Sequence, residues 1–112
     1  MGLQVFGTRK CPDTRKAERW LKERGVKYQF VDLAGKGMSP GELRSVAAAL
    51  GIDALVDQEG ERYARRGLAY LEADLEEELL ADPLLLKTPV VRDGKRASVG
   101  YRPELWKAWL GG

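Results

Sequence analysis

Hydrophobic and polar residues alternate with a strand period at the start of the chain and then recur with a helical period. Residues 3–6 alternate between two glycines, which predicts a short first strand. From Pro12 the apolar positions recur at helical spacing, which predicts a helix that ends at Gly25. Residues 28–32 then predict a second strand. A helix between two such strands indicates a βαβ unit with parallel strands.

The middle of the chain carries helical patterns and no further strand signal. Residues 39–42 combine a capping box with a proline at the first helical position. We expect a short turn at residues 53–56, a mostly irregular polar loop at residues 57–67 and an acidic helix that Pro83 closes. The prediction is an all-helical insert over about residues 39–82. The apolar face of the acidic helix is predicted to consist of Leu71, Leu75, Leu79 and Leu80.

Two short strands and a helix are predicted at the end of the chain. Residues 90–92 and 95–99 flank Asp93-Gly94, a strong signal for a β-hairpin with a type I′ turn. Residues 105–110 have the apolar spacing of an amphipathic helix. The complete order predicts a thioredoxin-like α/β fold, in which helices flank a small mixed sheet of about four strands. The helical insert separates its βαβ and ββα halves.

Composition and charge exclude several classes of function. The 112 residues suit one domain over residues 1–112, and 19 Lys and Arg against 17 Asp and Glu leave a formal charge of +2. That balance is unlike a dedicated nucleic-acid-binding domain. No apolar run reaches the roughly 18 residues of a membrane span, and no signal-peptide pattern opens the chain. We therefore expect a cytoplasmic protein that binds neither nucleic acid nor a membrane directly.

Two residue types limit the possible chemistry. The chain has no histidine, which excludes Ser-His and Cys-His catalysis and most zinc sites. It has one cysteine, so neither an intramolecular disulfide nor a Cys-x-x-Cys pair can form. We predict no metal site and no bound cofactor.

The single cysteine, Cys11, stands where the first strand meets the first helix. N–H groups of the first helical turn, with Arg9, Lys10 and Arg15 nearby, favour its thiolate, whereas Asp13 opposes it. Two interpretations are open: a nucleophile beside an oxyanion site, or a small, partly buried residue without a role. The junction favours the first. We predict a pKa below that of a free cysteine.

Thr88-Pro89 stands immediately before the predicted hairpin. A proline at the start of a strand can follow a trans or a cis bond. A thioredoxin-like order brings this segment close to Cys11, so we predict a cis bond with Pro89 beside the thiol. Together with Pro12 and Thr14, Thr88 and Pro89 are predicted to shape the site. Cations that could face an anion there are Lys87, Arg92, Arg96 and Arg102, with Arg102 favoured because it starts the last helix.

These residues together resemble the glutaredoxin-coupled arsenate reductase family, which includes the Spx-type regulators. The resemblance runs nearly end to end, and the stretch from Cys11 to Asp32 is also similar to glutaredoxins. It implies a thioredoxin fold with a helical insert. The segments that carry the resemblance are residues 5–11, the helix ending at Gly25, the Glu42-Leu43 helix, and residues 84–91 and 99–101.

This chain departs from the family at the residues that hold the substrate. The resemblance implies an oxyanion held by the cysteine and three arginines, of which Arg102 matches one. Asp57 and Glu59 stand in the loop where another is expected, and Thr88 stands before the proline. Spx-type regulators often carry a Cys-x-x-Cys switch, and here Thr14 replaces the second cysteine.

Two functions follow as hypotheses. The first is a thiol-dependent oxidoreductase in which Cys11 is the nucleophile and Arg102, Lys87 and Arg9 hold an anionic substrate or a glutathione carboxylate. An external thiol such as glutathione, with glutaredoxin as a possible partner, would resolve the mixed disulfide. We expect poor or absent arsenate reduction. The second is a non-enzymatic, Spx-like regulator that binds a protein partner such as RNA polymerase.

Overall fold

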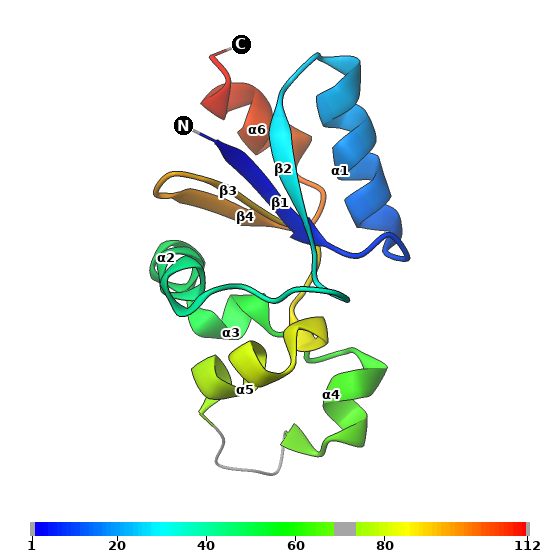
Figure 1. The fold of residues 1–112 in the computed structure, drawn as a ribbon, viewed down its shortest axis with the longest axis vertical. Coiled ribbons are helices and arrows are strands. Elements are labelled where there is room, and N and C mark those ends of the chain that lie inside the picture. Colours follow the sequence, from blue (N-terminus) through cyan, green and yellow to red (C-terminus); the bar gives the residue numbers. More distant parts are fainter. Residues whose placement is uncertain (1, 69–73, 112) are drawn as a thin grey trace.

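The computed structural model describes residues 2–68 and 74–111, and its centre is a mixed four-stranded sheet (Figure 1). The predicted α/β fold is confirmed. Helices α2 to α5 separate the second strand from the third, so the insert between the two halves is helical. The elements are β1 Leu3–Gly7, α1 Pro12–Glu23, β2 Tyr28–Asp32, α2 Pro40–Leu50, α3 Ile52–Leu55, α4 Glu61–Arg65, α5 Leu75–Ala81, a short 3₁₀ turn Pro83–Leu85, β3 Val90–Asp93, β4 Arg96–Val99 and α6 Pro103–Trp109.

The strands are ordered β2-β1-β3-β4 across the sheet. β1 pairs in parallel with β2, so that Leu3 lies opposite Tyr28. It pairs antiparallel with β3, where Val5 lies opposite Val91, and β3 continues antiparallel into β4. The βαβ connection therefore brings the ends of β1 and β2 to the same edge of the sheet, the edge at which α1 begins.

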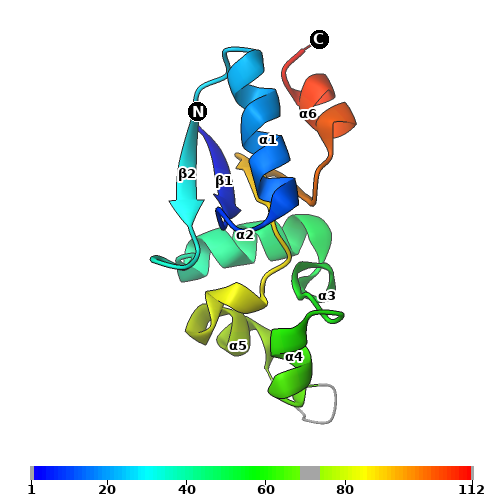
Figure 2. The same ribbon diagram turned by 90° about the vertical axis from the view of Figure 1, so that its right-hand side faces the viewer.

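Each face of the sheet has its own hydrophobic core. Helices α1 and α6 cover one face, where the rings of Trp20 and Trp106 meet edge to face with centroids 5.7 Å apart. Trp106 is fully buried and donates a hydrogen bond from Nε1 to Ser98 Oγ at 2.8 Å. Helices α2, α3 and α5 pack on the other core, which includes Phe6 and Val90. In the turned view of Figure 2, α1 and α6 stand beside the strands and the insert lies below them.

Helix α4 forms within the segment predicted to be mostly loop, so that prediction is wrong for Glu61–Arg65. Its polar sequence has no apolar stripe to reveal a helix. In the structure Tyr63 packs against the core of the insert. Arg62 and Arg66 both lie 3.3 Å from Asp82, the C-cap residue of α5, and Arg66 also pairs with Glu78. α5 itself ends before Pro83, as predicted, while Leu71 lies outside the described residues.

The hairpin forms as predicted, but its turn is one residue later and of another type. Asp93 pairs with Arg96, so the two central residues are Gly94 and Lys95. Gly94 has a φ of 61°, whereas Lys95 does not have a positive φ. A type I′ turn needs positive φ at both positions, so this combination is that of a type II′ turn. Asp93 stays in the strand because it pairs with Leu3 of β1 and its carboxylate accepts from Arg96 at 2.6 Å.

No helix among residues 2–68 and 74–111 is both long and apolar enough to cross a membrane.

The junction between β1 and α1 is closely packed. Thr14 in the first turn of α1 is fully buried against Gly7, the last residue of β1. A Cβ at Gly7 would lie 2.5 Å from Thr14 Oγ1 and 2.7 Å from its Cγ2. Because Thr14 is β-branched, rotation about χ1 cannot move both atoms away. The absence of a side chain at Gly7 therefore sets how closely α1 approaches the sheet.

We predict that Gly7→Ala lowers the free energy of unfolding by about 1–3 kcal/mol, the usual cost of overpacking a core. Denaturant unfolding measures the change. The matched control is Gly41→Ala in the first turn of α2, where nothing lies within 4 Å of the added Cβ. An equal effect of both substitutions would contradict the packing argument.

Candidate functional site

Cys11 is the N-cap residue of α1, with an extended backbone (φ −79°, ψ 120°). Pro12 is the first helical residue, where its missing N–H leaves no hydrogen bond unmade. The Cys11 N–H donates to Thr8 O at 3.2 Å, and its carbonyl accepts from the Arg15 N–H at 3.1 Å. A tight loop and the first helical turn thus hold the half-buried thiol at the edge where β1 ends.

The Thr88-Pro89 bond is cis, as predicted, and the segment lies against the thiol. Cys11 Sγ donates a hydrogen bond to Thr88 O at 3.7 Å. Pro89 is fully buried, and its carbonyl accepts from the Gly100 N–H at 2.8 Å, which ties the segment to the end of β4. Residues 77 positions apart in the chain therefore form one site.

The pKa of the Cys11 thiol is lowered, which confirms the predicted direction. Burial acts in the opposite sense and is the largest single influence. Together, hydrogen bonds from the side chains of Thr14 and Thr88 and from the backbone N–H groups of Thr14 and Asp13 outweigh it. Arg9, Lys10 and Arg15 are not among the principal causes of this shift, which come from neutral groups. Asp13 favours the thiolate through its N–H.

The Thr14 hydroxyl explains how the sulfur is stabilised on ionisation. Its Oγ1 is buried and has no hydrogen-bond partner while the thiol proton is donated to Thr88 O. When the proton leaves, the sulfur becomes an acceptor for this hydroxyl. Since folding lowers this pKa, the thiol's contribution to stability is fully present above its unfolded pKa and is lost as the pH falls through its folded pKa.

Among the described residues, none of the three predicted anion-binding side chains forms a hydrogen bond to the sulfur. Arg9 immediately precedes the Cys11 loop, and its guanidinium lies 4.8 Å from the Phe30 ring centroid. Lys87 is exposed and directly precedes Thr88. Arg102 is the N-cap residue of α6, and its Nε donates to the Glu104 carboxylate at 2.8 Å. Within residues 2–68 and 74–111 the sulfur is bonded to neutral groups only.

The acidic loop after α3 is anchored beside this segment. The Lys87 N–H donates to Leu55 O at 2.7 Å, and the Asp57 N–H donates to Leu85 O at 2.9 Å. Val56 and Leu86 thus form an antiparallel bridge, and Asp57 directly follows it. The backbone of this loop is therefore fixed to the segment before Thr88, while the Asp57 carboxylate lies against its own turn beside Gly60.

Other basic residues are engaged elsewhere in the fold. Arg92 donates to Gln4 Oε1 at 2.6 Å and to Ser45 Oγ at 3.2 Å, so it joins the sheet to α2. Arg96 pairs with Asp93 in the hairpin. Both guanidinium groups are thus bound to side chains of the sheet and of α2.

Sequence reasoning missed the groups that hold Arg9. Glu18 lies 3.9 Å from the Arg9 guanidinium and accepts a hydrogen bond from the Tyr28 hydroxyl at 2.9 Å. Burial, followed by this hydrogen bond, raises the pKa of Tyr28 to about 12. The signal was present, because Glu18 stands four residues after Thr14 on the buried face of α1.

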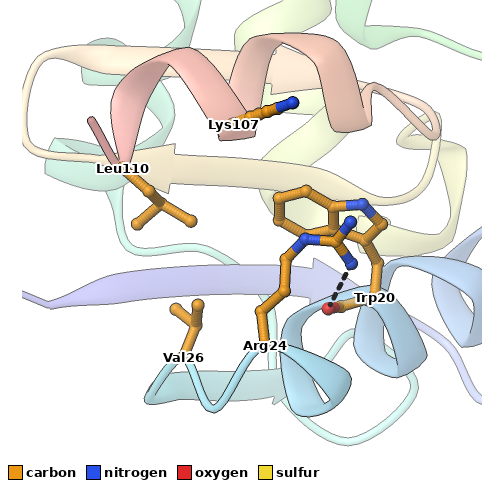
Figure 3. A pocket seen from close by; sticks show the side chains of 5 residues that line it. All are labelled: Trp20, Arg24, Val26, Lys107 and Leu110. Carbon is orange, nitrogen blue, oxygen red and sulfur yellow. Dashed lines mark hydrogen bonds between the residues drawn. The ribbon is translucent and has the colours of Figure 1, made fainter. Parts of the chain in front are cut away.

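A separate hollow of about 390 Å³ lies between α1 and α6, lined by Trp20, Arg24, Val26, Lys107 and Leu110 (Figure 3). Arg24 covers the Trp20 ring at 4.0 Å and donates to the Trp20 carbonyl. Cys11 caps the opposite end of α1, whose 12 residues span about 18 Å. This hollow is therefore not part of the thiol site.

Comparisons with known proteins agree with the fold and extend over nearly the whole chain. The sequence model of the ArsC family matches residues 6–109. The chain is 30% identical to the uncharacterized protein YusI of Bacillus subtilis, over 93% of this chain and 94% of YusI. It is 28% identical to the global transcriptional regulator Spx 2 of Oceanobacillus iheyensis, over 97% of this chain and 93% of that protein. The solved structure of the YffB (PA3664) protein matches with a TM-score of 0.84 and 28% identity, over 95% of this chain and 96% of that one.

We predict that alkylation of Cys11 by iodoacetamide, measured against pH, has a midpoint below about 8.5, the value for a free cysteine. Thr14→Val removes the hydroxyl and keeps the shape, so the midpoint should rise. Thr8→Val is the matched control, because the Thr8 side chain is not among the groups that shift this pKa. An unchanged midpoint in Thr14→Val would show that the hydroxyl does not stabilise the thiolate.

Proposed function

This chain belongs to the ArsC family, and we propose that it acts as a thiol-dependent oxidoreductase in which Cys11 is the nucleophile. The observation that carries the proposal is the half-buried thiol at the start of α1, surrounded by hydrogen bonds that favour its ionised form. The thiolate is the reactive form of cysteine. With one cysteine in the chain, the reaction requires an external thiol to complete it.

The proposed reaction is thiol–disulfide exchange in two steps. The Cys11 thiolate attacks one sulfur of a disulfide, so that a bond from Sγ to that sulfur forms and the original S–S bond breaks. The other sulfur leaves as a thiolate and takes a proton from water. An external thiolate, from glutathione or a glutaredoxin, then attacks the mixed disulfide and releases Cys11. One half of the substrate is thus released as a thiol and the other half as a mixed disulfide with the external thiol; a second external thiol reduces that mixed disulfide, so two external thiols are oxidised for each substrate disulfide.

Other residues of the site have supporting roles in this proposal. Pro12, Thr14, Thr88 and Pro89 hold the Cys11 sulfur in position for attack, Thr14 and Pro89 from inside the fold, where both are fully buried. Their rigidity favours one direction of attack, because Pro12 begins a helix and Pro89 is fully buried.

Arg9, Lys87 and Arg102 are assigned to negative charge on the substrate. Arg9 and Lys87 directly adjoin the two segments that meet at the sulfur. Arg102 is bonded to Glu104, and must exchange that carboxylate for the substrate's in order to take part.

A second candidate function is that of a non-enzymatic regulator that binds RNA polymerase. The observation in its favour is the 28% identity to Spx 2 over 97% of the chain. With Thr14 in place of a second cysteine, such a regulator would not switch through an internal disulfide. Binding to purified RNA polymerase that is equal for the wild type and Cys11→Ser, without thiol exchange, would favour this function.

We predict that glutathione disulfide adds one glutathionyl group to the protein at Cys11, and that excess glutathione removes it. The thiolate supplies the nucleophile and the external thiol supplies the resolving sulfur. Intact-protein mass spectrometry measures both steps. Cys11→Ser should remain unmodified. Failure of the folded wild type to form the adduct would contradict the oxidoreductase proposal.

We predict arsenate reduction close to background in an assay coupled to glutathione and glutaredoxin. A dianion needs several preorganised donors, and the loss of one typically costs about 10²–10³ in rate. Here Arg102 is bonded to Glu104, and the loop that carries Asp57 is joined to the segment before Thr88. Robust turnover that disappears in Cys11→Ser would contradict this expectation and would show that other cations hold the oxyanion.

A further inference from the structure

A hollow of about 270 Å³ opens beside the loop that carries Cys11, and the proposed function does not yet use it. It lies at the carboxyl ends of β1 and β2, which are joined there by a hydrogen bond from the Leu33 N–H to Gly7 O at 2.9 Å. Ligands of open α/β sheets bind at this end of the strands. The lining residues are Thr8, Arg9, Lys10, Asp32, Ala34 and Leu84.

The hollow and the thiol share the same tight loop. The hydrogen bond from the Cys11 N–H to Thr8 O closes that loop, and the Arg15 guanidinium donates to Arg9 O at 3.0 Å and fixes it from outside. Leu84, on the opposite wall, precedes Thr88 by four residues, and Thr88 O accepts the thiol hydrogen bond. A molecule whose sulfur reaches Cys11 therefore has this hollow beside it.

The cationic wall consists of two residues with different surroundings. Arg9 lies over the Phe30 ring and 3.9 Å from Glu18, so its direction is set and part of its charge is balanced. Lys10 is exposed, and no carboxylate among residues 2–68 and 74–111 lies within 4.0 Å of its amine. Lys10 is thus the cation with most of its charge available to a ligand.

The other wall carries one acid and two apolar side chains. Asp32 accepts a hydrogen bond from the Ala34 N–H at 3.0 Å, which orients its carboxylate and leaves acceptor capacity. Leu84 is 39% exposed and presents apolar surface to the hollow. The walls thus present positive charge, negative charge and apolar surface within a small volume.

From this arrangement, and resting on the proposed function, we infer that the hollow receives the amino-acid end of a small disulfide. The ligand carboxylate pairs with Lys10 and Arg9, its ammonium pairs with Asp32, and its methylene groups lie against Leu84. The Cys11 thiolate then attacks the nearer sulfur, and the other half of the disulfide leaves as a thiolate that takes a proton from water. A ligand that carries both charges matches the hollow better than a simple dianion, which Asp32 repels.

Four small disulfides separate the contributions of the two charges. Cystine carries both groups, dithiodipropionate only carboxylates, cystamine only ammonium groups, and hydroxyethyl disulfide neither. The rate of mixed-disulfide formation at Cys11 is measured for each by mass spectrometry. Each rate is divided by that of mercaptoethanol with the same disulfide, which removes differences in intrinsic reactivity.

We expect the folded protein to prefer cystine over hydroxyethyl disulfide, with each ion pair contributing about fivefold. Lys10→Gln should lose the preference for cystine and dithiodipropionate, which carry carboxylates. Asp32→Asn should lose the preference for cystine and cystamine, which carry ammonium groups. Lys22→Gln, an exposed lysine at the far end of α1, is the matched control and should change neither.

Equal normalised rates for all four disulfides would overturn the inference and leave the proposed function intact. So would an equal change in all four rates in Lys10→Gln, because that lysine would then act on the thiolate and not on the ligand. If the neutral hydroxyethyl disulfide fails to react with folded Cys11, the proposed oxidoreductase function itself fails.

Discussion

The packing of Thr14 on Gly7 is the contact on which the geometry of the thiol site depends. Because Gly7 has no side chain, α1 begins directly against the end of β1, with Thr14 fully buried between them. That approach places the N-cap residue Cys11 within hydrogen-bond distance of Thr88 O. It also leaves the Thr14 hydroxyl without a partner beside the sulfur. One contact therefore sets both the position of the thiol and the stabilisation of its thiolate.

The charges around the thiol are more balanced than the basic residues near Cys11 suggest. Arg9 faces Glu18, Arg102 faces Glu104, and the loop that carries Asp57 is joined to the segment before Thr88. The groups that favour the thiolate are therefore neutral hydrogen-bond donors. This arrangement is consistent with the proposed chemistry on thiols and disulfides, whose reacting sulfurs carry less charge than an oxyanion such as arsenate.

Much of the fold could be predicted because its elements have local signals. Strand alternation, the capping box of α2 and prolines at helix starts depend on neighbours a few residues apart. The failures have non-local causes. In helix α4, Tyr63 packs on the core, and Arg62 and Arg66 pair with Glu78 and Asp82, 12 to 20 residues later. The hairpin turn lies one residue later than predicted because Asp93 pairs with β1, about 90 positions earlier in the chain.

The sequence by itself determined the order of the strands and of most helices, the single cysteine and the segment that meets it. Residues adjacent in the sequence are enough to recognise the first strand, the cysteine before a proline and the later Thr-Pro. Only the tertiary structure decided which groups surround the sulfur and which acid each arginine faces. The physical reason is that long charged side chains pair with groups that are near in space and distant in the sequence. The partners of Arg9 and Arg92 come from several elements. Contacts of that kind exist only after the sheet and helices have packed.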